Sequence, residues 1–190
     1  MSYDAAGDRY DVGRYRRCGR SGLKLPADIP QTLNVMHVSD GVPATYPNGA
    51  HVAEVEIDPD TGIVEVVKYV AVNDFGTELN PLLVQGQVHG GLVQGLGQAL
   101  MEHTVYNEDG QLLTGSFTDY ALPRAADTPF FSIGYHSVPA KTNVLGAKGC
   151  GEAGCAGSLP SVMNAIVDAL GGKHINMPAT PERVWEALNS

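Results

Sequence analysis

The residues best suited to chemistry lie in a glycine-rich segment near the C-terminus, GAKGCGEAGCAG, which spans residues 146–157. Consecutive glycines allow backbone conformations that point several N–H groups at one place, and a helix that starts directly after them adds partial positive charge. An anion or a polar ligand is therefore expected there. The carboxylate of Glu152 stands in the middle of the segment, with Lys148 four residues earlier.

The sequence leaves three roles open for Glu152. It can cap the helix that follows, it can pair with Lys148, or it can act as a general base beside a reacting atom. The segment matches neither the P-loop pattern GxxxxGK[ST] nor GxGxxG after a strand. These two kinds of phosphate site are therefore excluded.

A second group of polar and small residues lies on a helix predicted from Asn80 to about His103. The pair Asn80-Pro81 is a favourable start, because Asn can accept a hydrogen bond from a free amide and Pro fits the first helical position. Apolar residues recur every four positions and form the stripe expected to pack on a sheet: Val84, Val88, Leu92, Leu96 and Leu100. Polar and small residues lie on another side: Gln87, Gly90, Gly91, Gln94, Gly97 and Gln98.

Five glycines between Gly86 and Gly97 require a compensating gain, since each costs about 1 kcal/mol relative to alanine inside a helix. Close packing of another helix or of the sheet would explain the glycines but not the glutamines. A buried primary amide needs partners for two donors and one acceptor, and a ligand with amide-like edges, such as a pterin, would supply them. Packing and ligand binding both stay open at this point.

Other segments supply the elements that must position these residues. Residues 51–57 and 63–72 are β-branched and partly alternating, and DPDTG between them predicts a tight turn, so a β-hairpin is expected. A second hairpin-like region is expected around the turn Tyr106–Gln111. An irregular stretch then carries loops and a proline-interrupted strand up to Pro139.

Two helices are predicted to close the chain. The first covers Ser158–Leu170, where apolar residues have helical spacing and two glycines follow. Thr180 is expected to cap the second, PERVWEAL, whose expected core contacts are Val184, Trp185 and Leu188. The predicted fold class is α+β, with a mixed or antiparallel sheet of hairpins packed against the long glycine-rich helix and two C-terminal helices.

Charge and composition divide the chain into two parts. The first 24 residues hold six of the twelve Lys and Arg residues against three aspartates. Residues 1–41 are therefore interpreted as a basic N-terminal arm with a first strand, QTLNVMHVSDG, and residues 42–190 as the main domain. A solvated or partner-covered extension is favoured for the arm over one that docks on RNA.

The overall composition excludes several classes of protein. Hydrophobic residues make up 43% and charged residues 17% of the 190 residues, as in a globular protein. The net charge of −9 disfavours a nucleic acid or an anionic membrane as partner. No apolar run is long enough to cross a bilayer and the start has no signal-peptide pattern, so a cytoplasmic protein is expected. Cys18, Cys150 and Cys155 are interpreted as thiols, and no metal ligands are assigned.

Five segments resemble, in order and at compatible spacing, the C-terminal part of the molybdopterin-binding large subunit of the xanthine oxidase, aldehyde oxidase and carbon monoxide dehydrogenase-like family. They are GQVHGGLVQGLGQAL (86–100), SFTDYALPRA (116–125), GAKGCGEAG (146–154), SVMNAIVDALG (161–171) and MPATPERVWEAL (177–188). The resemblance extends over residues 42–190 and is strongest to the bacterial aldehyde oxidase and carbon monoxide dehydrogenase-like large subunits.

The resemblance implies roles for particular residues. The glutamate of the family's GxGE motif, which is the base beside molybdenum, falls on Glu152. The glutamine that contacts the pterin falls on Gln87. The other implied cofactor-binding positions are Gly86, Gln94, Lys148, Gly149 and Gly151. The cofactor's dithiolene holds the metal, so no protein ligand is implied, and Cys150 and Cys155 become small packed residues.

The implied function is oxidative hydroxylation of an aldehyde or an N-heterocycle, with electrons passing to iron–sulfur and flavin (FAD) partner subunits. The implied cofactor is molybdopterin or its cytosine dinucleotide form. The family's large subunits are several times longer, so a complementary molybdenum-binding chain is expected and the isolated chain is expected to be inactive. An exposed apolar face should mark the interface with that chain, or with a second copy of this one.

Two alternatives belong to other classes of protein. The chain can be a cofactor-free module of the same fold that acts as an interaction or structural protein. It can also be a binding protein for another anionic small molecule, held by the glycine-rich segment.

Overall fold

The computed structural model describes residues 15–17, 24–26, 41 and 43–190, and the chain forms two compact units, Met1–Gly41 and Val42–Ser190. In the first unit, strands β1 (Tyr15–Arg17) and β2 (Lys24–Pro26) pair antiparallel. The rest of the predicted basic arm lies outside the described residues, as does the predicted first strand except for Gly41.

The predicted β-hairpin is confirmed in the second unit. Strands β3 (Asn48–Ile57) and β4 (Val64–Asp74) pair antiparallel, with a bulge at Glu54 and Val55. The turn between them is closed by Asp58, whose carboxylate accepts the Thr61 hydroxyl at 2.7 Å. Alternation of apolar and polar residues along both strands buries one face of the pair.

A third strand makes the sheet mixed. Strand β5 (Phe131–Tyr135) pairs parallel with β4, so the order is β3-β4-β5. Parallel neighbours need a crossover connection, and here the crossover contains the long helix and a short 3-10 turn, η1 (Ala125–Asp127). The predicted α+β class with a mixed sheet is thus confirmed. The second predicted turn is also present, where Tyr106 and Leu112 form an isolated bridge.

The glycine-rich helix α1 (Pro81–Leu100) begins where the sequence predicted. Its free Leu83 amide donates to Asn80 Oδ1 at 3.2 Å, which is the expected cap. The helix ends three residues before the predicted His103, because the Glu102 amide donates at 2.8 Å to the Gly97 carbonyl, five residues earlier, and so leaves the regular i to i−4 pattern. Within the apolar stripe Val88, Leu92 and Leu96 are fully buried.

Helix α2 (Ala153–Ala169) begins five residues before the predicted start at Ser158, so the prediction of that boundary was wrong. Part of the predicted glycine-rich loop is therefore helical. The cause is packing, since a Cβ on Gly154 would lie 2.6 Å from the carbonyl oxygen of Val88 and 2.8 Å from the amide nitrogen of Leu92. Such close contact with α1 stabilises a helix that propensity alone disfavours.

The last helix, α3 (Pro181–Asn189), follows the prediction with two differences. Thr180 occupies the cap position, but its side chain makes no capping hydrogen bond. Val184 is fully buried, whereas Trp185 is 45% exposed and is not a core residue. Trp185 lies at the surface because it covers the turn of the β3-β4 hairpin, where a Cβ on Gly62 would be 2.9 Å from the Trp185 Cβ.

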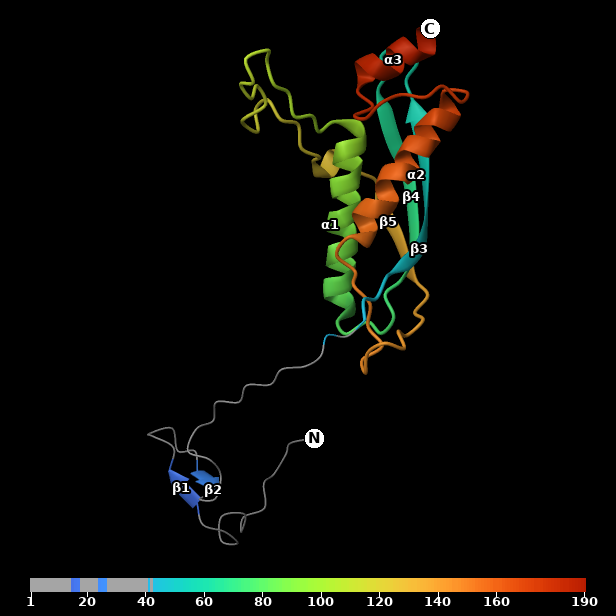
Figure 1. Ribbon diagram of the computed structural model, residues 1–190. Coiled ribbons are helices and arrows are strands. Elements are labelled where there is room, and N and C mark those ends of the chain that lie inside the picture. The colour runs from blue at the N-terminus through green and yellow to red at the C-terminus, as the bar shows by residue number, and fades with distance from the viewer. Residues whose placement is uncertain (1–14, 18–23, 27–40, 42) are drawn as a thin grey trace. The chain divides into compact units, whose positions relative to one another are not determined.

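The helices form a layer on the sheet of the second unit. Helix α2 lies across β3 and β4, and α1 packs beside α2 (Figure 1). The core between them consists of Val66, Tyr69, Ala71, Phe75, Val88, Leu92, Leu96, Ala99, Val162, Ile166, Leu170, Ala179 and Val184. The ends of β4 and β5 and the start of α1 lie at one end of this unit, and the loop that leads into α2 runs from there to the middle of α1 (Figure 1). In the described part of the chain, no helix has both the length and the apolar character needed to cross a membrane.

Candidate functional site

The structure brings Gln87 of α1 next to the loop that carries Glu152. Gln87 and Gly91 are four residues apart and so share one face of α1. Gly91 touches the first turn of α2, since a Cβ there would lie 3.0 Å from the Cys155 amide nitrogen. One turn earlier, Gln87 therefore lies over the loop before α2. A Cβ on Gly151 would be 3.9 Å from Gln87 Oε1 and, apart from its chain neighbours, would meet no other atom of the described residues within 4 Å.

Glu152 is exposed and stands at the cap position of α2. Its carbonyl oxygen accepts the Ala156 amide at 2.9 Å, but its carboxylate makes no capping hydrogen bond. It also makes no ion pair with Lys148, whose ammonium is bound to Asp74. Of the three roles open in the sequence, the structure shows neither the pair with Lys148 nor a side-chain cap of α2 by Glu152.

Asp74 is a residue of this region that the sequence analysis missed. Its Oδ2 lies 2.6 Å from Lys148 Nζ, and the two side chains are only 13% and 11% exposed. The Lys148 ammonium, followed by the amides of Val138 and Gly76, holds the pKa of Asp74 well below its usual value of 3.8. The available signal was an Asp two residues before a Gly, which is typical of a turn in which the side chain binds the backbone.

The predicted cofactor-binding glycines are open. A Cβ on Gly86, Gly90 or Gly149 would meet no atom of the described residues within 4 Å. Gln87 and Gln94 are also exposed rather than buried, which corrects the assumption that the glutamine amides are enclosed. Gln94 lies about 10 Å further along the axis of α1 than Gln87, so the structure does not bring it to the loop.

Other glycines of α1 are explained by packing. A Cβ on Gly95 would clash with the Ser158 hydroxyl and lie 3.0 Å from the Cys155 carbonyl oxygen, both in α2. Gly91 makes a similar contact. A Cβ on Gly97 would lie 2.7 Å from Pro123, in the segment after α1. The packing interpretation is thus confirmed for these three positions and fails for Gly86 and Gly90.

The end of the second unit that holds Gln87 also exposes apolar side chains. Leu79, Leu82 and Leu83, at the start of α1, are 66%, 77% and 65% exposed. Val144 and Leu145 precede the glycine-rich loop and are exposed as well. The Thr77 amide donates to the Gly146 carbonyl at 2.9 Å, so the two groups belong to neighbouring segments. Exposed apolar groups of this kind are typical of surfaces that contact another protein.

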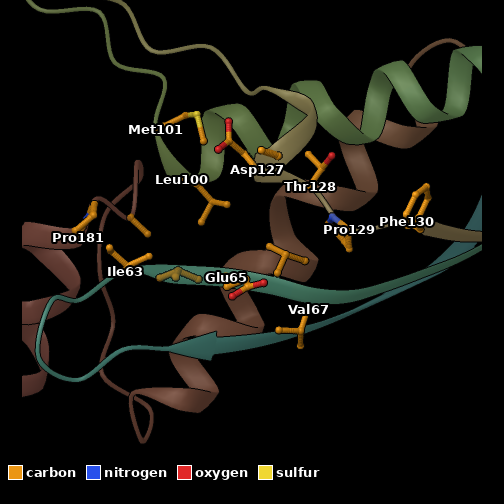
Figure 2. A pocket seen from close by; sticks show the side chains of 14 residues that line it. Ile63, Glu65, Val67, Leu100, Met101, Asp127, Thr128, Pro129, Phe130 and Pro181 are labelled. Carbon is orange, nitrogen blue, oxygen red and sulfur yellow. The ribbon is translucent and has the colours of Figure 1, made fainter.

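A cavity of about 740 Å³ lies elsewhere, between the start of β4, the end of α1 and the η1 segment. Figure 2 shows Ile63, Glu65 and Val67 of β4 and its flank on one side of the cavity, with Leu100 and Asp127 among the residues across from them. None of the predicted site residues lines it. The start of β4 is about 30 Å from the end that carries Asp74, so the cavity and the candidate site are separate.

Metal-ligating groups are sparse in the described residues. No group of three or more His, Cys, Asp and Glu side chains is placed to hold a metal ion among them. Cys150 and Cys155 are free, half-buried thiols. At this end of the domain, the groups that the described residues offer to a ligand are the open glycine backbone, the Gln87 amide and the Glu152 carboxylate.

Comparison with known proteins assigns the family. Residues 29–129 match the model of the molybdopterin cofactor-binding domain. The carbon monoxide dehydrogenase large chain of Hydrogenophaga pseudoflava is 37% identical over 166 residues, which are 86% of this chain and 21% of that protein. The nicotine 6-hydroxylase large subunit of Paenarthrobacter nicotinovorans is 40% identical over 167 residues, 86% of this chain and 20% of that protein. The chain belongs to the molybdopterin cofactor-binding domain family.

Solved structures agree with this assignment. A copper- and molybdenum-containing carbon monoxide dehydrogenase has a TM-score of 0.72 at 39% identity, covering 75% of this chain and 18% of its own. Quinoline 2-oxidoreductase from Pseudomonas putida 86 has a TM-score of 0.72 at 36% identity, covering 76% and 19%. The resemblance of the sequence motifs to molybdenum hydroxylase large subunits is confirmed. This molybdopterin cofactor-binding domain spans about a fifth of the length of the relatives it matches.

Proposed function

We propose that this chain supplies the catalytic base and part of the pterin site of a molybdenum hydroxylase, which hydroxylates an aldehyde or an N-heterocycle. The observation that carries the proposal is the meeting of Gln87 with the loop Gly149–Glu152. An exposed amide, open glycine backbone and a carboxylate without a partner among the described residues lie together at one end of the domain. Membership of the molybdopterin cofactor-binding domain family supports it.

The residues present fit a pterin. Gly86 and Gly149 leave open space where a side chain would stand, and a flat ring system can approach bare backbone closely. The Gln87 amide offers two donors and one acceptor, which match the amide-like edge of a pterin or of its cytosine dinucleotide form. Gln94 would contact a more distant part of the cofactor. Lys148 would shape the loop through Asp74 rather than bind the cofactor by its charge.

The chemistry divides between the cofactor and the chain. When bound, the molybdenum cofactor supplies the two-electron oxidation of the substrate carbon, and the electrons leave through iron–sulfur and flavin subunits. The chain's own part is to hold the pterin edge with Gln87 and the backbone of Gly149 and Gly151. The carboxylate of Glu152 would be the general base, which accepts a proton from the oxygen nucleophile as that oxygen attacks the substrate carbon.

A complementary chain would complete the site. The domain covers about a fifth of its relatives. The exposed apolar residues Leu82 and Leu83 at the start of α1 and Val144 before the glycine-rich loop belong to segments joined by the hydrogen bond from Thr77 to Gly146. We propose that a larger molybdenum-binding chain covers this apolar surface. Iron–sulfur and FAD subunits would complete the complex, which we expect in the cytoplasm. A second copy of this chain is the competing occupant, and a nucleic acid is disfavoured by the net charge of −9.

The direct test is Glu152→Gln in the complex that co-purifies with this chain. This substitution keeps the size of the side chain and removes the base, so turnover should fall by about 100-fold or more, with the molybdenum and pterin contents unchanged. Glu54→Gln, on the outward face of β3, is the matched control and should leave turnover unchanged. Normal turnover in Glu152→Gln with full molybdenum would refute the assigned role.

The second candidate is a cofactor-free module of the same fold. This candidate is supported by Gly91 and Gly95, because their close packing against α2 explains why glycine occupies these positions without any ligand. Metal analysis and pterin fluorescence of the chain, purified with and without cell extract, separate the two candidates. Absence of molybdenum and pterin from every preparation and complex would favour the module.

A further inference from the structure

Asp74, the last residue of β4, accepts three hydrogen bonds on one carboxylate. Its Oδ1 accepts the backbone amides of Gly76 and Val138, each at 2.9 Å. Its Oδ2 accepts Lys148 Nζ at 2.6 Å. Hydrogen bonds to an ionised group are about twice as strong as neutral ones. The Asp74 carboxylate therefore holds the segments that carry these three donors to the end of β4.

The three donors come from the turn after β4, the segment after β5 and the glycine-rich loop. Backbone hydrogen bonds run beside the carboxylate and join the same segments. The Lys148 amide donates to the Phe75 carbonyl at 2.8 Å, and the Thr77 amide donates to the Gly146 carbonyl at 2.9 Å. Both the backbone and the side chain of Lys148 are thus held to the end of β4.

Beyond Lys148, the half-buried Cys150 packs against the core, whereas the glycines on either side of it have few contacts. Gly149 has open space around its Cβ position, and Gly151 has only Gln87 Oε1 nearby. After Glu152, Ala153 packs against the core and Gly154 lies against the backbone of Val88 in α1. The exposed Glu152 therefore lies between contacts at Lys148 and Cys150 on one side and contacts at Ala153 and Gly154 on the other.

We propose that Asp74 is a positioning residue, which fixes the loop Gly149–Glu152 through Lys148 and so sets where the Glu152 carboxylate stands relative to Gln87. The way the loop is held follows from the contacts alone, and only the consequence for catalysis rests on the proposed function. Asp74 itself touches neither the cofactor nor the substrate in this proposal. The ammonium of Lys148 acts as a structural ion.

The first measurement is hydrogen exchange by NMR on the full chain without cofactor. Asp74→Asn and Lys148→Met should speed exchange at the Lys148 and Thr77 amides by at least about 10-fold, because a charged hydrogen bond that holds them is lost. The nuclear Overhauser contact between the Gln87 side-chain amide and Gly151 should weaken in both variants. Amides in the middle of β4 should exchange as before.

Two further variants separate positioning from general stability. Lys148→Arg keeps the ion pair with Asp74 and should keep the slow exchange of the loop amides. If Lys148 acted only through the size and packing of its side chain, this substitution should speed the exchange instead. Asp58→Asn removes a carboxylate that also accepts hydrogen bonds, in the remote turn at the other end of β4, and should leave the loop amides unchanged. Lys148→Met retains the hydrogen bonds from the Gly76 and Val138 amides to Asp74. It can therefore test the role of the ion pair even if Asp74→Asn does not fold.

In the molybdenum-containing complex, Asp74→Asn should lower kcat by about 10-fold with KM unchanged, since a displaced base weakens the reaction and not substrate binding. Unchanged exchange at Lys148 and Thr77 in both Asp74→Asn and Lys148→Met would overturn the positioning role. Equal acceleration throughout β3 and β4 would overturn it too. If the loop loosens as expected but Glu152→Gln leaves turnover intact, the proposed function fails and the attachment stands.

Discussion

Helix α1 carries glycines on two of its sides, and the two sets have different surroundings. Gly91 and Gly95 face α2, where a side chain would collide with backbone or with Ser158. Gly86 and Gly90 face open space. Packing explains the first set completely. Gly86 and Gly90 still destabilise the helix by about 1 kcal/mol per residue. Because no packing contact within the domain explains them, they indicate a binding partner or ligand outside this chain.

The same contrast recurs across the start of α2. Gly154 lies against the backbone of α1, whereas the Cβ position of Gly149 is open within the described residues and that of Gly151 has only Gln87 nearby. Glu152 stands between the enclosed and the open glycines. A high glycine content alone therefore does not indicate a binding site. A glycine indicates one when the space at its Cβ position is not filled by any other part of the domain.

The largest stability effect is expected from Gly154→Ala. The added methyl group would lie within 3.0 Å of backbone atoms from Val88, Gly91 and Leu92, and backbone cannot rotate away as a side chain can. Overpacking of this kind lowers the free energy of unfolding by about 1–3 kcal/mol, and urea denaturation of the chain would measure it. Unchanged stability would mean that α1 and α2 do not pack through this glycine.

The opposite sign is expected from Gly90→Ala, the matched substitution on the open side. Alanine adds helix propensity and meets no obstacle within 4 Å in the described structure, so the free energy of unfolding should rise by about 0.5–1 kcal/mol. A loss of stability in the same urea experiment would break the distinction between the two sides of α1. Gly86→Ala should stabilise the chain in the same way, and would lower cofactor retention if the pterin lies there.

The smallest effect is expected from acid. The pKa of Asp74 is lowered by folding, so its contribution to stability is fully present above the usual carboxyl range, near pH 4, and is lost as pH falls below that range. The α1-α2 contact is made by glycines, backbone and Ser158 and should survive this change. NMR titration should show the Lys148 signals moving at low pH in the native chain and not in Asp74→Asn.

Local signals accounted for the elements that the sequence predicted correctly. The β3-β4 hairpin follows from alternation on both sides of DPDTG, and the start of α1 follows from Asn80-Pro81. The early start of α2 was missed because glycines disfavour a helix, and the stabilising contact comes from Val88, more than sixty residues earlier in the chain. The parallel partner of β5 was missed for the same reason, since no local pattern indicates which strand it joins.

The candidate site divides in the same way. Glu152 and Gln87 could be singled out by residue type and by the family motifs, and their proximity required the α1-α2 contact. Asp74 could not be singled out, because its partner Lys148 lies 74 positions away in the sequence. An aspartate at the end of a strand is common, and only the folded chain shows which cation it meets.

The parallel pairing of β4 with β5 also sets an order of assembly. The β3-β4 hairpin closes over a short turn, whereas β5 must return across the whole crossover from Asp74 to Phe131. Closing a long loop loses more chain entropy and forms more slowly. We therefore expect the β3-β4 hairpin to form early and the contact between Lys148 and Asp74, which needs the chain after β5, to form later. During synthesis, the β3-β4 hairpin would therefore form before the loop that carries Glu152 is held in place.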